Sequence, residues 1–465
     1  MTIPVAFASY RERVGAALAD GSRFAGLHAT SDGVLVRTML ADPDGTMRLE
    51  TVATEDGVVP SIVDLAPAAG WDEREAHDLQ GIRFAGHEPL RPLVNHDPAL
   101  ERWVKVRGDD VYQLAVGPIH AGIIESGHFR FHLVGDRILH LDAKLFYKHR
   151  GLERAAEGKT LDEGLPYVSR ACAACNVANG VAYANACEES LGLLPTAELR
   201  RARTILLELE RTWSHLNDIA AICAGVSLAA GNNSFAALTE RARRLNAVLT
   251  GHRFLFHTIR VGGSELMLDA DHVRAAREEV ASIAAAARRG WRELLFNSSF
   301  QDRLPEIGVV TAAHADRMGA VGPGARAAGL AQDLRANSPL LSYEGFSAAV
   351  PERAAGDVQA RLEQRALELW QTFALLDRLL DDPIRPASAE PGGRERPIGV
   401  GRVESPRGAT SCVVERRGDR IERLRLRTGS YANWPIVAFA ATDNLLPDFP
   451  LINKSFELCY ACVDR

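Results

Sequence analysis

The sequence contains no run of about 18 uncharged apolar residues, the length that a helix needs to cross a bilayer. Its most apolar stretch, IAAICAGVSLAAG at residues 219–231, is shorter and is interrupted by glycine. The N-terminal stretch MTIPVAFASYRERVG lacks the basic start and apolar core of a signal peptide. We therefore expect a cytoplasmic protein without a membrane-spanning helix of its own.

An excess of positive charge is absent as well. The chain carries 54 Lys and Arg against 60 Asp and Glu, a net charge of −6, so its overall charge gives no indication of nucleic-acid binding. One local cluster, ELRRARTILLELERT at residues 198–212, alternates acids with arginines. This alternation predicts a solvated helix face rather than a basic patch.

Cysteine is scarce, and its seven residues show no disulfide-framework spacing. Thiols stay reduced in the cytoplasm, which favours metal ligation over cross-linking. Two C-x-x-C pairs stand out: Cys172 with Cys175, and Cys459 with Cys462. The other three cysteines, predicted to be small buried side chains, are Cys187, Cys223 and Cys412.

The fold class predicted from the pattern is α+β, in two domains. Residues 1–100 form a small α+β domain, because GVLVRTMLADPDGTMRLETVAT predicts a hairpin around DPDG and residues 71–80 predict a helix closed by Gly81. Residues 101–465 form a large, mainly helical domain with peripheral hairpins. Its strands are expected at residues 111–147 and 411–430, its helices between 150 and 380, and a Pro/Gly-rich linker or surface loop at 385–397.

The two cysteine pairs could form one site. The first pair is expected in the first turn of a helix, whose N-terminus favours thiolate over thiol. Four thiolates are a soft ligand set suited to Zn, Ni or Fe. Structural zinc sites usually draw both pairs from nearby loops, whereas these pairs lie far apart in the chain. On spacing alone, structural zinc and another metal are about equally favoured, and unrelated thiols remain the third alternative.

The order of the surrounding motifs resembles the large subunit of [NiFe] hydrogenases, of the membrane-associated, energy-converting group 4 type found in formate hydrogenlyase complexes. The N-terminal stretch WDEREAHDLQGIRFAGHEPLR separately resembles the 30-kDa subunit of respiratory complex I, and the fusion of the two is the arrangement of the hydrogenlyase large subunit. The resemblance covers nearly the whole chain. Its other motifs are GPIHAGIIESGHFRF, LFYKHRGLERAAEGKT, VGPGARAAGLAQDLRANSPLLSYE, ESPRGATSC, SYANWP and SFELCYACVDR.

The resemblance implies a Ni–Fe centre held by the four paired cysteines. Cys172 and Cys459 would be terminal nickel ligands, and Cys175 and Cys462 would bridge nickel to an iron that carries CO and cyanide. Soft thiolates suit both metals.

The resemblance also implies roles for two residues beside the cysteines. Arg407, in SPRG, corresponds to the arginine that overhangs the open metal position, where a permanent charge polarises bound hydrogen. Glu125, in IIESGHFR, corresponds to the glutamate that moves protons off a terminal cysteine.

Glu153, in HRGLE, matches a position that binds Mg²⁺ in many relatives together with a C-terminal histidine three residues past the last cysteine. Here that residue is Arg465, so we predict no Mg²⁺ site and expect Glu153 to pair with an arginine. No cysteines remain for an iron–sulfur cluster in this chain. The implied partners are a small subunit, similar to the complex I 20-kDa protein, with a [4Fe–4S] cluster, and antiporter-like membrane subunits. Hydrogen and protons would be the substrates, at the cytoplasmic face of the membrane.

Several residues depart from the family pattern: Ala173 replaces a glycine, Asn179 a histidine, Glu457-Leu458 an Asp-Pro pair and Asn337 an acid. Asparagine cannot titrate near neutral pH. These changes leave open an altered potential, an altered substrate or loss of the metal. The alternative is a complex-I-like NADH–quinone oxidoreductase subunit without nickel, in which GPIH would belong to a quinone-binding motif. A zinc-stapled scaffold would explain the cysteines but neither Arg407 nor Glu125.

Overall fold

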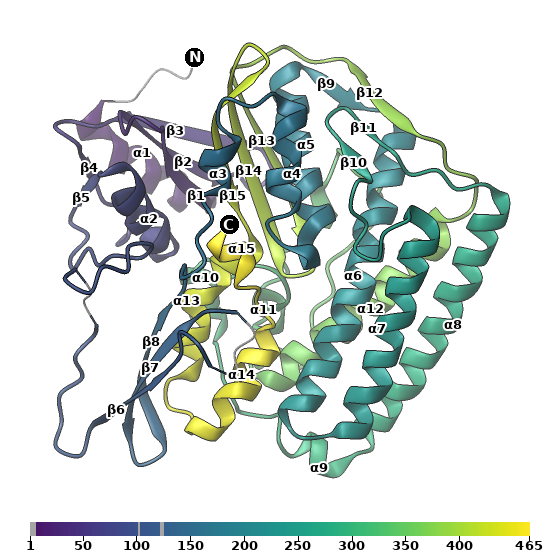
Figure 1. Cartoon of the computed structure of the whole chain (residues 1–465). Coiled ribbons are helices and arrows are strands. Elements are labelled where there is room, and N and C mark those ends of the chain that lie inside the picture. The colour runs from purple at the N-terminus through teal and green to yellow at the C-terminus, as the bar shows by residue number, and fades with distance from the viewer. Residues whose placement is uncertain (1–5, 101–102, 121–124) are drawn as a thin grey trace.

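The computed structural model describes residues 6–100, 103–120 and 125–465 of the chain (Figure 1). Residues 1–5, where the sequence predicts no signal peptide, lie outside this description. So do residues 121–124, which belong to the motif GPIHAGIIESGHFRF.

The N-terminal part folds around a three-stranded antiparallel sheet in the order β1-β2-β3, with helices packed against it (Figure 1). Its core, which includes Tyr10, Leu27 and Val52, is separate from the main core. The hairpin and the helix predicted from the sequence are both confirmed, and Gly81 ends that helix with a φ of 71°. The elements are α1 (Phe7–Ala19), β1 (Arg23–Ala29), β2 (Leu35–Ala41), β3 (Met47–Ala53), β4 (Val58–Pro60), η1 (Pro67–Ala69), α2 (Gly70–Gln80) and β5 (Arg83–Ala85).

The larger part has strands at both ends of its sequence and long helices between them. The first elements are β6 (Tyr112–Val116), β7 (His128–Val134), β8 (Arg137–Lys144), α3 (Leu152–Ala156), α4 (Leu161–Ser169), η2 (Ala173–Cys175), α5 (Asn176–Leu191), β9 (Leu193–Pro195), α6 (Ala197–Gly225), α7 (Ala229–Thr250), β10 (Ile259–Arg260) and β11 (Gly263–Ser264). The next are α8 (Ala270–Leu295), α9 (Ser298–Gln301), α10 (Ala312–Arg317), α11 (Gly322–Ala327), η3 (Leu334–Asn337), α12 (Val358–Leu379) and β12 (Ala387–Pro391). The last are β13 (Ile398–Ser405), β14 (Gly408–Arg417), β15 (Arg420–Arg427), α13 (Gly429–Ala441), η4 (Leu446–Asp448), α14 (Phe449–Phe456) and α15 (Ala461–Asp464).

The sheet β13-β14-β15 lies between the N-terminal part and the helices (Figure 1). Helix α5 lies directly on β13, and two glycines permit this approach: a side chain at Gly399 or Gly401 would collide with the carbonyl oxygens of Ala186 or Ala182. The long helices α6, α7, α8 and α12 pack on the far side (Figure 1). The expected α+β class, with a small N-terminal part and a larger helical part, is confirmed. The exact boundary at residue 100 stays a prediction.

Two expectations about local structure are wrong. The linker expected at residues 385–397 contains β12, which pairs with β9. The solvated face expected on residues 198–212 is instead buried: Arg203, Glu208 and Arg211 have no exposed area. Arg203 donates to Glu188 at 2.8 Å, and Arg211 donates to Glu208 at 3.2 Å. Arg203, Glu208 and Arg211 of α6 therefore form ion pairs in the interior instead of facing water.

No helix in the described part of the chain is both long enough and apolar enough to span a membrane. The three cysteines expected to be small buried side chains are buried, as predicted: Cys187, Cys223 and Cys412 each have no exposed area.

Candidate metal centre

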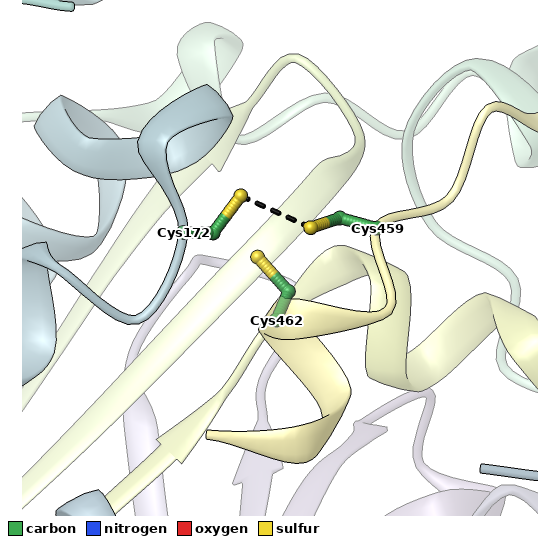
Figure 2. Close-up of side chains that lie close together, drawn as sticks. All are labelled: Cys172, Cys459 and Cys462. Atoms are coloured by element: carbon green, nitrogen blue, oxygen red, sulfur yellow. Dashed lines mark hydrogen bonds between the residues drawn. The ribbon is translucent and has the colours of Figure 1, made fainter. Parts of the chain in front are cut away.

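The two cysteine pairs, which come from opposite ends of the large part, lie together in one cluster, in which Cys459 is partly buried and the other three are buried. Figure 2 shows Cys172, Cys459 and Cys462 of this cluster. The Sγ atoms of Cys172 and Cys459 are 3.0 Å apart, and those of Cys172, Cys459 and Cys462 all lie within 4.8 Å of one another. Cys175 belongs to the same cluster and makes thiol contacts with Cys172 and Cys462. Sulfur atoms that share one metal at about 2.3 Å each would have spacings of this order.

The sequence predicted the first pair in the first turn of a helix. In the structure the pair lies instead in the turn before α5. Cys172 has extended backbone and its Sγ accepts from the amide of Ala174 at 3.3 Å. The first free amides of α5, at Val177 and Ala178, donate to the carboxylate of Glu210 at 2.6 and 3.1 Å. Burial raises the pKa of Glu210 to about 8, although these two hydrogen bonds oppose the shift.

The second pair is held by hydrogen bonds to its backbone. The amide of Cys459 donates to Ser430 Oγ at 3.0 Å, and Thr428 Oγ1 donates to the carbonyl of Cys462 at 3.2 Å. Arg150 ties the two pairs to each other, because its Nη2 donates to the carbonyl oxygen preceding Cys172 at 2.8 Å and to the one preceding Cys462 at 3.0 Å. The geometry of the cluster is therefore supported by the protein's own bonds.

Arg407 occupies the turn between β13 and β14 and points at the cluster. Its Nη1 lies 3.9 Å from Cys175 Sγ and donates to Ser214 Oγ at 3.1 Å. Its Nε donates to the carbonyl of Glu457 at 2.7 Å, and its Nη2 lies 3.7 Å from Asp218. The guanidinium is buried but stays charged: burial lowers its pKa, and the charges of Asp218 and Cys175 raise it by more.

The thiol of Cys175 has a lowered pKa. Hydrogen bonds from Cys172 and Cys462 lower the pKa of Cys175 to about 5, and the positive charge of Arg407 acts in the same direction against the effect of burial. A buried set of soft thiols with one thiolate and a fixed cation beside it fits a thiolate-bound metal.

Glu125 lies next to the second pair. Burial and the neighbouring Cys459 raise its pKa, while the backbone amide of Ala461 opposes that shift. The loop of Glu125 runs close to the C-terminal segment: a Cβ added at Gly127 would lie 2.8 Å from Cε1 of Tyr460. A carboxyl whose pKa lies above its ordinary value can take up and release protons beside a thiol.

The positions that depart from the family pattern differ in their surroundings. Asn179, one turn into α5, is fully buried, and neither of its amide atoms has a hydrogen-bond partner among the residues that the structure describes. Glu457 has a φ of 47° and a pKa raised to about 7 by burial and by Asp218. Asn337 is exposed in η3 and lines a cavity described below, away from the cysteines.

Glu153 pairs with an arginine, as expected, at 2.7 Å from Nε of Arg465. Arg465 also lies 2.5 Å from Glu75 of α2, and Arg425 lies 2.6 Å from the same carboxylate. Burial would raise the pKa of both carboxyls, but the surrounding guanidinium groups, first Arg465 for Glu153 and Arg425 for Glu75, lower them. A guanidinium thus already neutralises Glu153, and Glu75 brings the N-terminal part into the same cluster.

Sequence reasoning missed several residues around the cysteines, above all Glu210 and Asp218. A signal was present: Glu210, Ser214 and Asp218 recur every four residues, which places them on one face of α6. That face contacts Arg407 through Ser214 and Asp218, and the turn of the first cysteine pair through Glu210.

Two families match parts of the chain. Residues 23–105 match the family described as respiratory-chain NADH dehydrogenase, 30 Kd subunit, and residues 231–390 match the respiratory-chain NADH dehydrogenase, 49 Kd subunit.

Individual relatives agree with this arrangement. Formate hydrogenlyase subunit 5 of Escherichia coli (strain K12) is 30% identical over 90% of this chain and 79% of its own length. An NADH-quinone oxidoreductase subunit of Phocaeicola vulgatus is 26% identical over 81% of each chain. Among solved structures, a chain of the membrane-bound sulfane sulfur reductase, an archaeal respiratory membrane complex, gives a TM-score of 0.70 at 26% identity, over 77% of this chain and 99% of that one.

An α+β chain with these two family matches is a large subunit of a complex-I-related oxidoreductase. Within that class, the chain belongs to the family of group 4 energy-converting hydrogenase large subunits. In this chain the 30-kDa-like and 49-kDa-like regions are fused. NADH–quinone oxidoreductase subunits, the alternative from the sequence, are also relatives but at lower identity.

Proposed function

We propose that this chain is the catalytic large subunit of a membrane-associated hydrogenase, and that its four clustered cysteines hold a Ni–Fe centre. The observation that carries the proposal is the meeting of Cys172, Cys175, Cys459 and Cys462 in one buried cluster beside the charged Arg407. A structural zinc site would need the four thiols but would not need a buried guanidinium against them. When bound, such a centre supplies the metal positions at which hydrogen is split or formed.

The protein's own residues divide the remaining work. Cys172, Cys175, Cys459 and Cys462 would hold the metals through their thiolates, which are soft ligands suited to both nickel and iron. The Glu125 carboxyl takes a proton near Cys459 Sγ and releases it toward solvent, a task for which its raised pKa is suited.

Arg407 contributes a fixed positive charge to the same site. Its hydrogen bonds to Ser214 and to the Glu457 carbonyl hold the guanidinium in place, so it does not have to reorganise when negative charge develops next to the thiolates.

Electrons would leave through a partner subunit with a [4Fe–4S] cluster, because the other cysteines, Cys187, Cys223 and Cys412, are dispersed in the core. Membrane subunits of the antiporter type would anchor the complex at the inner face of the cell membrane. In support, formate hydrogenlyase subunit 5 is by its name one subunit of an assembly, and the sulfane sulfur reductase is by its title a membrane-bound respiratory complex.

The test is metal analysis of the purified complex together with infrared spectroscopy. One nickel and one iron per chain, with CO and cyanide stretching bands and hydrogen evolution or uptake, would support the proposal. Zinc alone, or quinone-linked activity in a complex without nickel, would replace it with a zinc scaffold or with the NADH–quinone oxidoreductase alternative. The infrared bands separate these outcomes even if the isolated complex has lost its activity.

A further inference from the structure

A cavity of about 320 Å³ lies where the N-terminal part meets the large part, away from the cysteine cluster. Residues of β1–β3 and the loops between them, such as Phe24 and Met47, form one wall. Strand β13, with Arg402 and Glu404, and the segment around η3 form the others. This volume is in the range of sites that bind small molecules.

The acidic side chains that line the cavity are already neutralised by arginines. These pairs are Asp42 with Arg48 at 3.0 Å, Asp333 with Arg335 at 2.7 Å, and Glu404 with Arg326 at 2.9 Å. The carboxylates therefore leave no net negative charge in the wall for a cationic ligand.

Arg402 is different. Among the residues that the structure describes, no carboxylate lies within 4.0 Å of its guanidinium, and its one hydrogen-bond acceptor is the thioether of Met47 at 3.4 Å. Its Nε is buried without a partner. Arg402 is partly buried and lines the cavity, and a thioether is a weak acceptor, so the guanidinium is available to a stronger acceptor. Burial lowers the pKa of Arg402 to about 10, and the charges of Arg427 and Arg23 act in the same direction against that of Glu404.

We propose that this cavity binds a small organic anion, whose carboxylate or phosphate group pairs with Arg402 and whose apolar part contacts Phe24, Met47 and Leu341. A planar guanidinium binds either kind of anion through paired hydrogen bonds. The apolar part of the wall favours an organic anion over a bare inorganic ion.

The cavity wall is tied to the turn that carries Arg407. Val321 and Ala409 line the cavity. Asn433 accepts from the amide of Val321 at 3.1 Å, and its Nδ2 donates to the carbonyls of Val321 at 3.0 Å and of Arg407 at 3.3 Å. Hydrogen bonds of Asn433 therefore connect the cavity wall to the backbone of Arg407. The proposed binding does not rest on the proposed function.

The binding test uses the complete chain and four probes built on one ring: benzoate, phenyl phosphate, neutral benzamide and cationic benzylamine. Ligand-observed NMR titration should show saturable binding of benzoate or phenyl phosphate, at least about tenfold tighter than benzamide, because an ion pair is lost with the charge. Comparison of the two anions identifies whether the carboxylate or the phosphate is preferred. Equal binding of all four probes, or saturable binding of neither anion, would overturn the proposal.

Variants identify the guanidinium as the anchor. Arg402→Gln should weaken the bound anion at least about tenfold, and Arg402→Lys should weaken it less because it keeps the charge. The matched control is Arg394→Gln, an exposed arginine outside the cavity, which should bind like the wild type. Unchanged binding in Arg402→Gln would contradict the proposed anchor.

The stability of the variant without ligand is a second measurement. It distinguishes an arginine that binds a ligand from one that only stabilises the fold. Arg402→Gln removes a guanidinium whose one hydrogen bond within the chain is to a thioether, so its denaturation midpoint without ligand should equal that of the wild type. A clearly lower midpoint would show that Arg402 serves the fold, and would count against the proposal.

Discussion

The C-terminal segment takes part in two buried polar clusters, one at Cys459 and Cys462 and one at Arg465. Around Arg465, carboxylates and guanidinium groups are matched within the chain: Glu75 and Glu153 each contact Arg465, with Arg425 beside them. At the cysteines, thiols face one another, and the buried Asn179 one turn further along α5 has no partner among the described residues. The charges around Arg465 are paired with opposite charges of the chain itself, whereas the cysteine cluster offers thiols that suit a metal.

Cys462→Ser should have the largest effect, because it removes a soft ligand from the cysteine cluster and puts a hard hydroxyl in its place. We expect nickel and hydrogen turnover both to be lost, measured by elemental analysis and by hydrogen evolution. Cys223→Ala, at a buried cysteine of α6 outside the cluster, should keep the nickel. Normal nickel content in Cys462→Ser would remove this cysteine from the site.

Glu75→Gln removes from the Arg465 cluster the carboxylate that belongs to the N-terminal part. It leaves Arg425 and Arg465 buried with one carboxylate fewer, which should lower the free energy of unfolding by about 3–5 kcal/mol. Denaturant unfolding of the complete chain measures this. Glu12→Gln, at an exposed site on α1, should stay within about 0.5 kcal/mol of the wild type. If the two variants unfold alike, the cluster does not stabilise the contact between the two parts.

Arg407→Lys tests the cation beside the thiols. Lysine keeps the charge but loses the fork that binds Ser214 and the Glu457 carbonyl, so turnover should fall about 10²–10³-fold while nickel is retained. Elemental analysis and turnover are measured on the same sample. Loss of nickel in this variant would mean that Arg407 acts in holding the metal, and unchanged turnover would mean that it has no catalytic part.

Glu415 of β14 forms a second contact between the two parts, with Arg37 and His28. This contact should make the free energy of unfolding fall in acid. Burial would raise the pKa of Glu415, but hydrogen bonds from Arg37 and His28 lower it to about 2. A lowered carboxyl pKa contributes stability that is present above the unfolded value of about 4.5 and lost as the pH falls through about 2. Acid unfolding of wild type and Glu415→Gln should differ by about 3 kcal/mol at neutral pH, and the difference should shrink below pH 4.5. A constant difference across the titration would contradict the ionic origin.

Asn179→Leu should have the smallest effect and the opposite sign. Removing a buried amide without partners should raise the free energy of unfolding of the metal-free chain by about 1–3 kcal/mol. Asn176→Leu is the matched control on the same helix, and it should be destabilising because the Asn176 amide donates to the carbonyl of Phe254 at 3.0 Å. Destabilisation by both substitutions would show that Asn179 has a partner after all.

The sequence indicated the parts of the fold whose signal is local. The DPDG hairpin, the helix ended by Gly81 and the two C-x-x-C pairs all depend on residues within a few positions of one another. Arg407 and Glu125 were identified from the family resemblance, which rests on the order of motifs along the chain. Both residues lie beside the cysteines.

The charges of α6 could not be interpreted in this way, because their partners lie far along the chain. Glu208 accepts from Tyr343 at 2.7 Å and from Thr372 at 2.6 Å, and Arg211 donates to the carbonyl of Glu404 at 2.6 Å. A helix with alternating acids and arginines has the same sequence pattern whether water or another part of the chain neutralises it. Only the tertiary structure decides between these outcomes, and here it made α6 an interior helix that also carries Glu210 and Asp218.

The double hydrogen bond of Arg150 bears on how such a protein could be assembled. The segments that it joins are separated by 289 residues of intervening chain between Ala171 and Ala461, and closing so long a loop costs about 6 kcal/mol by polymer estimates. Arg150 bonds to backbone carbonyls and not to sulfur, so it offsets part of that cost while all four thiols stay available to a ligand.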